Sequence, residues 1–258
     1  MITISIANQK GGVGKTTSAI NIATAMAASG WRTLLIDLDP QGNASTGLGI
    51  PSSNREMSSY DILVDRVAID ACLVPSSIPG LDLVPATVDL SGAEIELVGV
   101  EERTNRLRSA LEQHRGHDVC FIDCPPSLGL LTLNALCASD TLLVPLQCEF
   151  FALEGLSQLL QTVEQVQQRF NADLGIIGVA LTMFDRRNRL TDQVADDVRE
   201  CLGDLVFDAV IPRNVRLSEA PSHGLPALIY DHACMGSRAY MALARELIGR
   251  LPKQKAAA

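Results

Sequence analysis

Residues 8–17 bring glycines, lysines and hydroxyls together in one short segment. The string reads Asn-Gln-Lys-Gly-Gly-Val-Gly-Lys-Thr-Thr. A glycine-rich loop lets backbone N–H groups turn inward on a phosphate, and a helix that begins directly after it adds partial positive charge. Lys15 is placed to reach the β and γ phosphates, and the Thr16 hydroxyl is placed to hold Mg²⁺. The segment therefore predicts a site for a nucleoside triphosphate and magnesium.

A second lysine distinguishes this loop from the common pattern G-x-x-x-x-G-K-[ST]. Gln9 stands where that pattern has its first glycine, and the match is instead to x-K-G-G-x-G-K-T, in which Lys10 is the addition. Residues 1–7 alternate apolar and polar side chains and predict a strand, while the alanine-rich residues 18–28 predict a helix. This context favours a phosphate site over the alternative, a glycine-rich turn with two solvated lysines.

Two carboxylates follow the next predicted strand, 33–36. The apolar run ends there, and Asp37 and Asp39 begin a string of turn-forming residues that reaches Gly42. In open α/β sheets ligands gather beyond the carboxyl ends of the strands, so both aspartates should face the phosphate loop. Asp37 could then act on the magnesium shell, and Asp39 could orient or deprotonate an attacking water. A turn that merely ends a strand is the alternative.

A third carboxylate closes another apolar strand, 119–122. Asp123 at its end is placed to accept hydrogen bonds from magnesium-bound water or from Thr16. The following loop, 125–129, contains two prolines and a glycine that cannot continue the strand. We interpret it as a stiff switch loop whose position could report the γ-phosphate.

The rest of the chain alternates strand and helix patterns. Further strands are predicted at 81–85, 141–146, 176–182 and 205–211, and helices at 58–64, 68–72, 90–111 with breaks, 130–137, 151–170, 192–202 and 237–251. Residues 51–80 are irregular, and their pattern indicates no role. The alternation implies right-handed crossovers and helices on both faces of a sheet. We expect one α/β domain over residues 1–251, doubly wound around a mostly parallel twisted sheet, and a short disordered tail at 252–258.

Composition excludes several classes of protein. The chain has 47% hydrophobic and 20% charged residues, enough for a full core. It contains no run of 18 apolar residues, and Met1 leads directly into a strand, so we expect a cytoplasmic protein without a membrane span or secretory signal. Seven cysteines without a C-x-x-C pair argue against a disulfide framework or structural zinc. The spacing of Cys120 and Cys124 does not match the usual iron–sulfur patterns. The four histidines are scattered, which leaves Mg²⁺ as the expected metal.

Five strings together resemble the chromosomal ParA (Soj) family of DNA-partitioning ATPases, from the first strand to about Gly249. They are Lys10–Thr17, Asp37–Gly42, Ile122–Leu130, Cys148–Leu160 and Ile211–Pro226. The two-lysine loop looks like the deviant Walker form of the P-loop NTPases. The resemblance implies an ATPase that closes into a sandwich homodimer with ATP at the interface and then binds double-stranded DNA without sequence preference. It further implies association with the nucleoid, a ParB-type partner that stimulates hydrolysis, and segregation of chromosome or plasmid DNA.

The resemblance also implies roles for individual residues. Phosphates would be held by Gly11, Gly12, Val13, Gly14, Lys15, Thr16 and Thr17, together with Lys10 acting on the nucleotide of the other subunit. Catalysis would fall to Lys10, Lys15, Asp39 and Asp123, and magnesium to Thr16, Asp37 and Asp123. Adenine would rest among loops after late strands, at Met183, Pro212, Arg213 and Asn214.

The charge balance is unfavourable for a DNA-binding protein. The chain carries a net charge of −9. Salt limits the repulsion of DNA to roughly 8–10 Å, so a compact basic patch can still bind at contact. The candidates lie on two loops and are duplicated when two subunits pair: Arg186, Arg187, Arg189 and Arg216. The alternative is that these arginines are solvated surface charges.

Other users of a two-lysine phosphate loop remain alternatives. A MinD-like membrane ATPase would need a C-terminal amphipathic helix with large apolar residues, whereas residues 251–258 are short and contain Pro252. A ligase resembling dethiobiotin synthetase would need a substrate pocket that no residue pattern identifies. An electron carrier resembling nitrogenase reductase would need cysteines placed around a shared cluster, and the cysteine strings do not resemble that arrangement.

Overall fold

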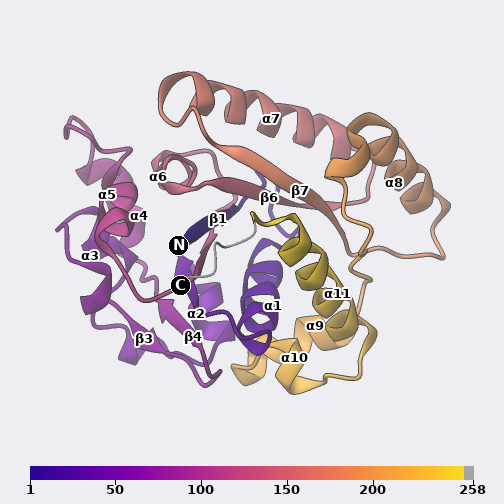
Figure 1. Cartoon of the computed structure of the whole chain (residues 1–258), viewed down its shortest axis with the longest axis horizontal. Helices are drawn as coiled ribbons and strands as arrows, with labels where there is room; N and C mark the ends of the chain where they lie inside the picture. The colour runs from indigo at the N-terminus through magenta and orange to yellow at the C-terminus, as the bar shows by residue number, and fades with distance from the viewer. Residues whose placement is uncertain (253–258) are drawn as a thin grey trace.

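The computed structural model describes residues 1–252 and contains a seven-stranded sheet with strand order β3-β4-β2-β5-β1-β6-β7 (Figure 1). All neighbouring strands are parallel except the short pair β3 and β4. The strands are β1 (Ile2–Ile6), β2 (Thr33–Asp37), β3 (Val74–Pro75), β4 (Leu81–Val84), β5 (Val119–Asp123), β6 (Thr141–Gln147) and β7 (Gly175–Thr182).

The order of the strands brings three carboxyl ends together. Strand β5 lies between β1 and β2, so that Asp123 is in register with Ile6 on one side and with Asp37 on the other. Parallel strands end at the same edge of a sheet, and the loops that leave this edge therefore converge. The fold thus places the phosphate loop beside both predicted carboxylate positions.

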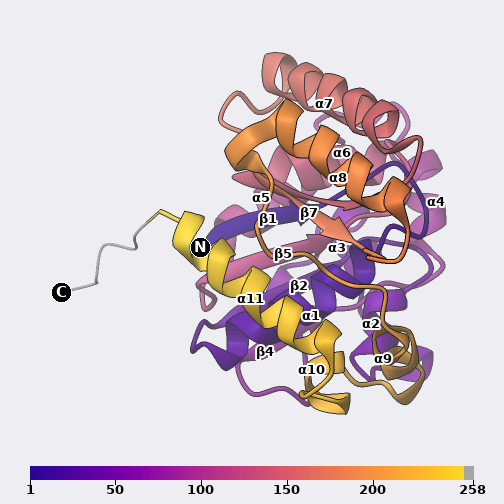
Figure 2. The same cartoon turned by 90° about the vertical axis from the view of Figure 1, so that its right-hand side faces the viewer.

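Helices cover both faces of the sheet (Figure 2). One face is covered by α3 (Ser59–Leu63), α4 (Leu90–Glu96), α5 (Arg106–Gln113), α6 (Leu130–Ala138), α7 (Ala152–Arg169) and α8 (Arg189–Leu202). The other is covered by α1 (Lys15–Ala28), α2 (Asn43–Gly47), α9 (Val215–Glu219), α10 (Ala227–Tyr230) and α11 (Met235–Arg250). The predicted doubly wound α/β architecture with a mostly parallel sheet is confirmed.

Alternation along the central strands explains the two apolar layers. Consecutive strand residues point to opposite faces. In β5, Cys120 and Ile122 belong to the layer under α4–α8, whereas Val119 and Phe121 belong to the layer under α1 and α11. All four side chains are fully buried. A strand covered on both faces therefore reads as a continuous apolar run rather than as an alternating one.

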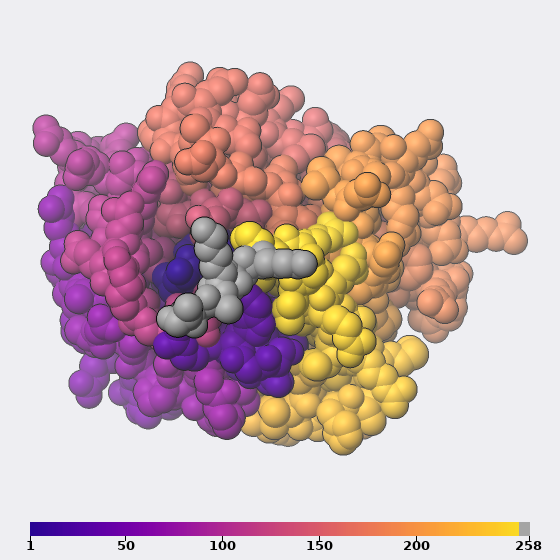
Figure 3. All heavy atoms as spheres, viewed as in Figure 1, coloured from indigo at the N-terminus to yellow at the C-terminus, as the bar shows by residue number. Residues whose placement is uncertain are grey.

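The C-terminal helix closes against the helix that follows the phosphate loop. The space-filling view shows residues of the last helix, in yellow, beside residues of the N-terminal part of the chain, in indigo (Figure 3). Tyr240 of α11 is buried, and its hydroxyl lies 3.1 Å from the Ser18 hydroxyl of α1. Buried hydroxyls need such partners, so this contact fixes α11 on the start of α1.

The predicted strand at 205–211 is wrong. The segment makes one isolated bridge to β7, between Val206 and Val179, and its backbone hydrogen bonds to that strand run from Phe207 N to Val179 O and from Ile211 N to Leu181 O. Side chains of α11 satisfy further backbone groups of the segment, because Arg250 donates to Leu205 O and Val206 O and Glu246 accepts from two amides. An apolar run therefore lies along the sheet edge without forming a regular ladder.

Smaller differences concern the irregular parts of the chain. The broken helix predicted at 90–111 is two helices, α4 and α5, and the helix at 68–72 is a 3₁₀ turn, η2 (Ile69–Ala71). Further 3₁₀ turns are η1 (Ser52–Asn54), η3 (Gly203–Leu205) and η4 (Ala220–His223). Apart from Pro252, the predicted tail lies outside the described residues. Within residues 1–252, no helix combines the length and apolarity needed to cross a membrane.

Candidate nucleotide site

The phosphate loop connects β1 to α1 and turns twice through left-handed backbone. Gly12 has φ 76° and Gly14, immediately before α1, has φ 87°. Residues with a Cβ rarely adopt such angles, which explains glycine at these positions. Helix α1 then begins at Lys15, so its free N–H groups face the space enclosed by the loop. The segment has the geometry of an anion site.

Side-chain hydrogen bonds hold both ends of this loop. Asn8 donates through Nδ2 to Pro145 O of β6 at 2.8 Å and accepts from Lys10 N at 3.0 Å. At the other end, the Thr182 hydroxyl donates to Val13 O at 2.8 Å. All three bonds link the loop to itself or to the two strands on one side of β1. The loop is therefore shaped before any phosphate arrives.

The two lysines of the loop have different environments. Lys15 is only 6% exposed, and its Nζ donates to Lys10 O at 3.0 Å. Burial lowers the pKa of Lys15, and the charge of Asp123 opposes this effect. The Lys10 side chain is 46% exposed and forms an ion pair with Glu149, which follows β6. Lys15 thus serves the interior of the loop, whereas Lys10 lies at its surface.

Asp123 is a buried carboxylate that lacks partners. It is fully buried, and neither carboxylate oxygen has a hydrogen-bond partner among the described residues. Burial raises the pKa of Asp123 well above its usual value, and the charge of Asp37 adds to the rise. The Thr16 hydroxyl is near enough to oppose this shift without a well-aligned hydrogen bond. Unpaired oxygens beside a hydroxyl are the ligands that Mg²⁺ prefers, so these residues fit that ion.

The two aspartates at the carboxyl end of β2 differ in their hydrogen bonds. Asp37 is fully buried and accepts at Oδ2 from both the amide (2.8 Å) and the hydroxyl (2.7 Å) of Ser45. Burial raises the pKa of Asp37 to about 6, against the effect of these hydrogen bonds. Asp39 is 7% exposed and accepts from Gln41 N at 2.9 Å. Asp37 is thus fixed by its neighbours, and among the described residues the Asp39 carboxylate accepts a hydrogen bond at Oδ1 alone.

The four residues predicted to contact adenine lie together beside the phosphate loop. They line one cavity of about 500 Å³ with Gly14 and Thr17: Met183, Pro212, Arg213 and Asn214. Two backbone hydrogen bonds join the loops that carry them, from Phe184 N to Ile211 O and from Arg213 N to Phe184 O, each 3.0 Å. The structure thereby brings the predicted base contacts to the predicted phosphate site. Their contact with a nucleotide stays a prediction.

The four candidate arginines for DNA are all exposed, but they differ in their partners. Arg187 is paired with Asp185 through two bonds of 2.9 and 2.8 Å. Arg216 contacts Glu219 at 2.9 Å and Asp231 at 3.5 Å. Arg186 borders, with Arg187 and Arg213, a hollow of about 970 Å³ next to the start of α8, which begins at Arg189. Acidic side chains thus partly neutralise two of the four.

Sequence reasoning missed several residues of the site. Glu149, which pairs with Lys10, lies just beyond the carboxyl end of β6. The rule that identified Asp37 could have found it, because both residues follow a buried strand. Ser45 carries no such signal, since it acts through a hydrogen bond to a group that the pattern does not reveal.

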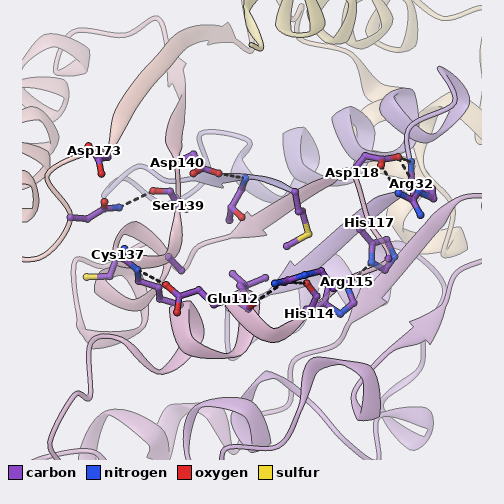
Figure 4. A pocket seen from close by; sticks show the side chains of 17 residues that line it. Arg32, Glu112, His114, Arg115, His117, Asp118, Cys137, Ser139, Asp140 and Asp173 are labelled. Atoms are coloured by element: carbon purple, nitrogen blue, oxygen red, sulfur yellow. Dashed lines mark hydrogen bonds and ion pairs between the residues drawn. The ribbon is translucent and has the colours of Figure 1, made fainter. Parts of the chain in front are cut away.

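A second polar cavity lies at the opposite edge of the sheet, near the amino ends of the strands (Figure 4). It measures about 760 Å³ and includes Arg32, His114, His117 and Asp118. These groups are bound to partners, because Arg32 pairs with Asp118 at 2.7 Å and the two histidine rings join at 2.7 Å. The outer ring nitrogens contact Asp70 and Asp82. This edge carries none of the predicted phosphate, metal or base contacts.

Comparison with known proteins relates the chain to ATPases. A family model described as an AAA domain matches residues 1–176. The chromosome partitioning protein ParA of Caulobacter vibrioides is 58% identical over 250 residues, which cover 96% of this chain and 94% of that protein. The sporulation initiation inhibitor protein Soj of Bacillus subtilis is 53% identical over 245 residues, with 95% and 97% covered.

A solved structure has the same fold. Cobyrinic acid a,c-diamide synthase from Mycobacterium smegmatis, with bound ADP and magnesium, aligns with a TM-score of 0.83 at 38% identity. The alignment covers 96% of this chain and 94% of that one. The ParA and Soj sequences are more similar to this chain than the synthase is, since they are 58% and 53% identical.

Proposed function

Because the chain belongs to the AAA domain family and, within it, to the ParA/Soj chromosome-partitioning ATPases, we propose that it is an ATP-dependent DNA-segregation switch. ATP with Mg²⁺ would close two copies into a sandwich dimer, and the dimer would bind DNA without sequence preference. A ParB-type partner would stimulate hydrolysis and release the DNA. The cargo would be a chromosome or a plasmid, and the DNA-bound form would associate with the nucleoid.

The different exposure of the two lysines carries this proposal. Lys15 is buried at the loop, whereas the ammonium of Lys10 lies at the surface with a counter-charge from its own chain, Glu149. A single bound triphosphate needs only the inward-facing lysine. An exposed lysine at the edge of the loop is suited to the phosphates of a second subunit laid against this face. The arrangement favours a dimer over an ATPase that works alone.

The bound nucleotide would be held by groups at the carboxyl edge of the sheet. Amides of the loop and Lys15 would contact the phosphates, while Met183 and Pro212 border the cavity for the base. Thr16 and Asp123 would hold Mg²⁺, with Asp37 orienting its water shell. The ion would neutralise charge on the β and γ phosphate oxygens.

Hydrolysis would consist of one in-line displacement. A water oxygen bonds to the γ phosphorus, the bond to the β–γ bridging oxygen breaks, and ADP and inorganic phosphate result. Asp39 would orient this water, whose proton passes to the carboxylate or to a phosphate oxygen. The ground state is already well neutralised, so extra positive charge is needed as the transition state forms. A ParB-type partner could supply that charge or move the 125–129 loop.

DNA binding would use the arginines near the β7 and α9 loops. The net charge of −9 opposes binding by a single subunit. Pairing doubles the number of exposed arginines, and each phosphate contact adds about −0.9 to the slope of log K against log salt. A dimer with four contacts would therefore give a slope of about −3.6. Binding would be weak for the monomer and useful for the ATP-bound dimer.

DNA retardation with ATP, ADP and no nucleotide, each at two salt concentrations, tests the proposal. We expect a shift with ATP and Mg²⁺ that weakens with salt and disappears with ADP. DNA binding that is the same with ATP, ADP and no nucleotide, or an absence of DNA binding with ATP, would contradict the proposed nucleotide-dependent binding of DNA. A second measurement is sedimentation of the Asp39→Ala variant saturated with ATP and Mg²⁺. A monomer at high protein concentration would contradict the sandwich dimer.

A further inference from the structure

Arg55 contacts the segment that follows the two aspartates at the carboxyl end of β2. Arg55 itself lies in the irregular region 51–80, whose sequence pattern indicates no role. We propose that Arg55 is a positioning residue for ATP hydrolysis, which fixes Asp37 and Asp39 relative to the phosphate loop. The inference rests on the proposed function, because it assumes that Asp39 orients the attacking water. It adds a group that acts from outside the site.

The Arg55 guanidinium makes four hydrogen bonds to three residues. Nη1 donates to Ala86 O at 2.9 Å, in the loop after β4. Nη2 donates to Thr46 Oγ1 of α2 and to Ile50 O, each at 2.8 Å, and Nε donates to Ile50 O at 3.1 Å. A planar guanidinium presents its donors in a fixed fork, so it sets the positions of all three acceptors at once.

One hydrogen-bonded path leads from Arg55 to the backbone of Asp39. The Thr46 hydroxyl, which accepts from Arg55, donates to Gly42 O at 3.0 Å. The Gly42 amide in turn donates to Asp39 O at 2.8 Å. The turn that presents the Asp39 carboxylate is therefore closed by Gly42, and Gly42 is held by the residue that Arg55 binds.

A second path leads to the carboxylate of Asp37. Ala86, whose carbonyl accepts from Arg55, donates its amide to Ser45 Oγ at 3.1 Å. Ser45 Oγ donates to Asp37 Oδ2 at 2.7 Å. Both backbone polar groups of Ala86 are thus hydrogen-bonded: the carbonyl accepts from Arg55 and the amide donates to Ser45. The two paths share the guanidinium and end on the two aspartates that the site employs.

Sterics and charge support the same arrangement. Gly42 has φ 60°, and a Cβ built on it would collide with Nη1 of Arg55. The guanidinium therefore lies directly against the backbone of the turn. Burial lowers the pKa of Arg55, and the negative charge of Asp37 opposes this shift.

Helix α2 needs such support because it has only five residues. Helices of this length have little stability of their own in water, and their position depends on tertiary contacts. Supporting residues of this kind, when removed, typically cost about 10- to 100-fold in activity while the groups they support remain present. Loss of Arg55 should therefore affect turnover more than nucleotide binding.

Steady-state ATP turnover of Arg55→Ala, Arg55→Lys and Thr46→Val, each compared with the wild type, tests the inference. We expect kcat of Arg55→Ala to fall about 10- to 100-fold with KM changed by less than about threefold. Arg55→Lys keeps the charge without the fork and should recover part of the loss. Arg108→Ala, which removes an exposed arginine on α5, is the matched control and should behave like the wild type.

A double variant separates positioning from a general loss of stability. Thr46→Val breaks the path to Gly42 that Arg55→Ala also breaks, so the combined variant should lose no more kcat than Arg55→Ala alone. Losses that multiply, or a kcat of Arg55→Ala equal to that of an active wild type, would overturn the inference.

Amide hydrogen exchange of residues 39–47 gives a readout that needs no turnover. The Gly42 and Ser45 amides donate hydrogen bonds to Asp39 and Asp37 and should exchange at least about 10-fold faster in Arg55→Ala. Unchanged exchange would contradict the role of Arg55 even if the wild type proved inactive. An inactive wild type with the expected exchange would instead contradict the proposed function.

Discussion

Lys10 and Glu149 form an ion pair within one chain, between the phosphate loop and the segment after β6. Their side chains are 46% and 31% exposed. Exposed pairs of this kind contribute only about 0–1 kcal/mol to stability, because water screens them and ordering the side chains costs entropy. In the proposed dimer, the triphosphate of the second subunit would carry several negative charges and would therefore displace Glu149. The pair holds Lys10 loosely at the surface from which it would act.

Lys10→Ala should separate nucleotide binding from dimer formation. Lys15 and the loop amides remain, so the affinity for ATP with Mg²⁺ should stay within about threefold of the wild-type value. The dimer should be lost, because no cation would cross to the second subunit. Equilibrium ATP binding and sedimentation with ATP measure the two effects. Glu149→Gln, which leaves Lys10 in place, is the control and should still dimerise. An ATP-dependent dimer of Lys10→Ala would refute this role.

Asp39→Ala should bind ATP and dimerise without turning it over. The loss of a group that orients or deprotonates water typically costs about 10²- to 10⁴-fold in rate. Phosphate release, measured with saturating ATP, Mg²⁺, DNA and any stimulating partner, reports the chemical step. Asp89→Ala, on the surface before α4, is a control for the loss of one carboxylate. Wild-type phosphate release from Asp39→Ala would remove this residue from catalysis.

Asp123→Asn should change how the stability of the nucleotide-free protein depends on pH. Burial raises the pKa of Asp123 in the folded state, so the folded protein binds a proton that the unfolded chain has already released. The resulting stability is present at low pH and is lost as pH rises through the folded-state pKa. As pH rises above about 4, the usual pKa of an aspartate in an unfolded chain, the free energy of unfolding measured in urea should therefore fall more for the wild type than for the variant. Parallel curves for the two proteins would contradict the shift.

Magnesium should reverse this pH dependence. A hard cation binds ionised carboxylates, so protons compete with Mg²⁺ at Asp123 and at Asp37, whose pKa is raised to about 6. The affinity for ATP in the presence of Mg²⁺ should fall as pH drops below about 6, while binding measured with a chelator should change less. Titrations of the wild type at several pH values measure both. Equal pH profiles with and without Mg²⁺ would argue against these ligands.

Arg186→Glu should weaken DNA binding by the ATP-bound dimer. Removing one phosphate contact from each subunit should reduce the magnitude of the salt slope by about 1.8, since each contact contributes about 0.9. Retardation across a salt series measures the slope, and ATP binding should be unaffected. Arg108→Glu makes the same charge change near the amino edge of the sheet. If both variants bind alike, Arg186 makes no specific contribution to the interface.

Local patterns predicted the elements that form the centre of the sheet. Strands β2 and β5 are nearly continuous apolar runs because both faces are covered, whereas β1 alternates apolar and polar residues. Strands β2 and β5 end at Asp37 and Asp123, and β1 ends at Ile6, just before the phosphate loop. The rule for carboxyl ends then sufficed to bring the phosphate loop and the carboxylates together. The predictions succeeded where the pattern along the chain and the tertiary structure impose the same requirement.

Contacts between distant side chains and backbone could not be predicted in this way. The apolar run 205–211 has the composition of a strand, yet Arg250 and Glu246 of the last helix form hydrogen bonds with four of its backbone groups. Likewise, Arg55 reaches Ala86, 31 residues away, through a bond that has no local periodicity. Such contacts depend on which distant segments lie side by side in the folded chain, and local patterns in a single sequence do not predict these neighbours.

The position of β1 between β5 and β6 gives the two sides of the phosphate loop different tasks. On the β5 side lies Asp123, suited to chemistry, and on the β6 side lies Glu149, suited to restraining the outward lysine. A nucleotide bound in the loop would affect the groups on both sides of it at the same time. Binding of a nucleotide inside the loop would therefore change the exposed surface around Lys10 directly, and no conformational change would have to pass through the sheet.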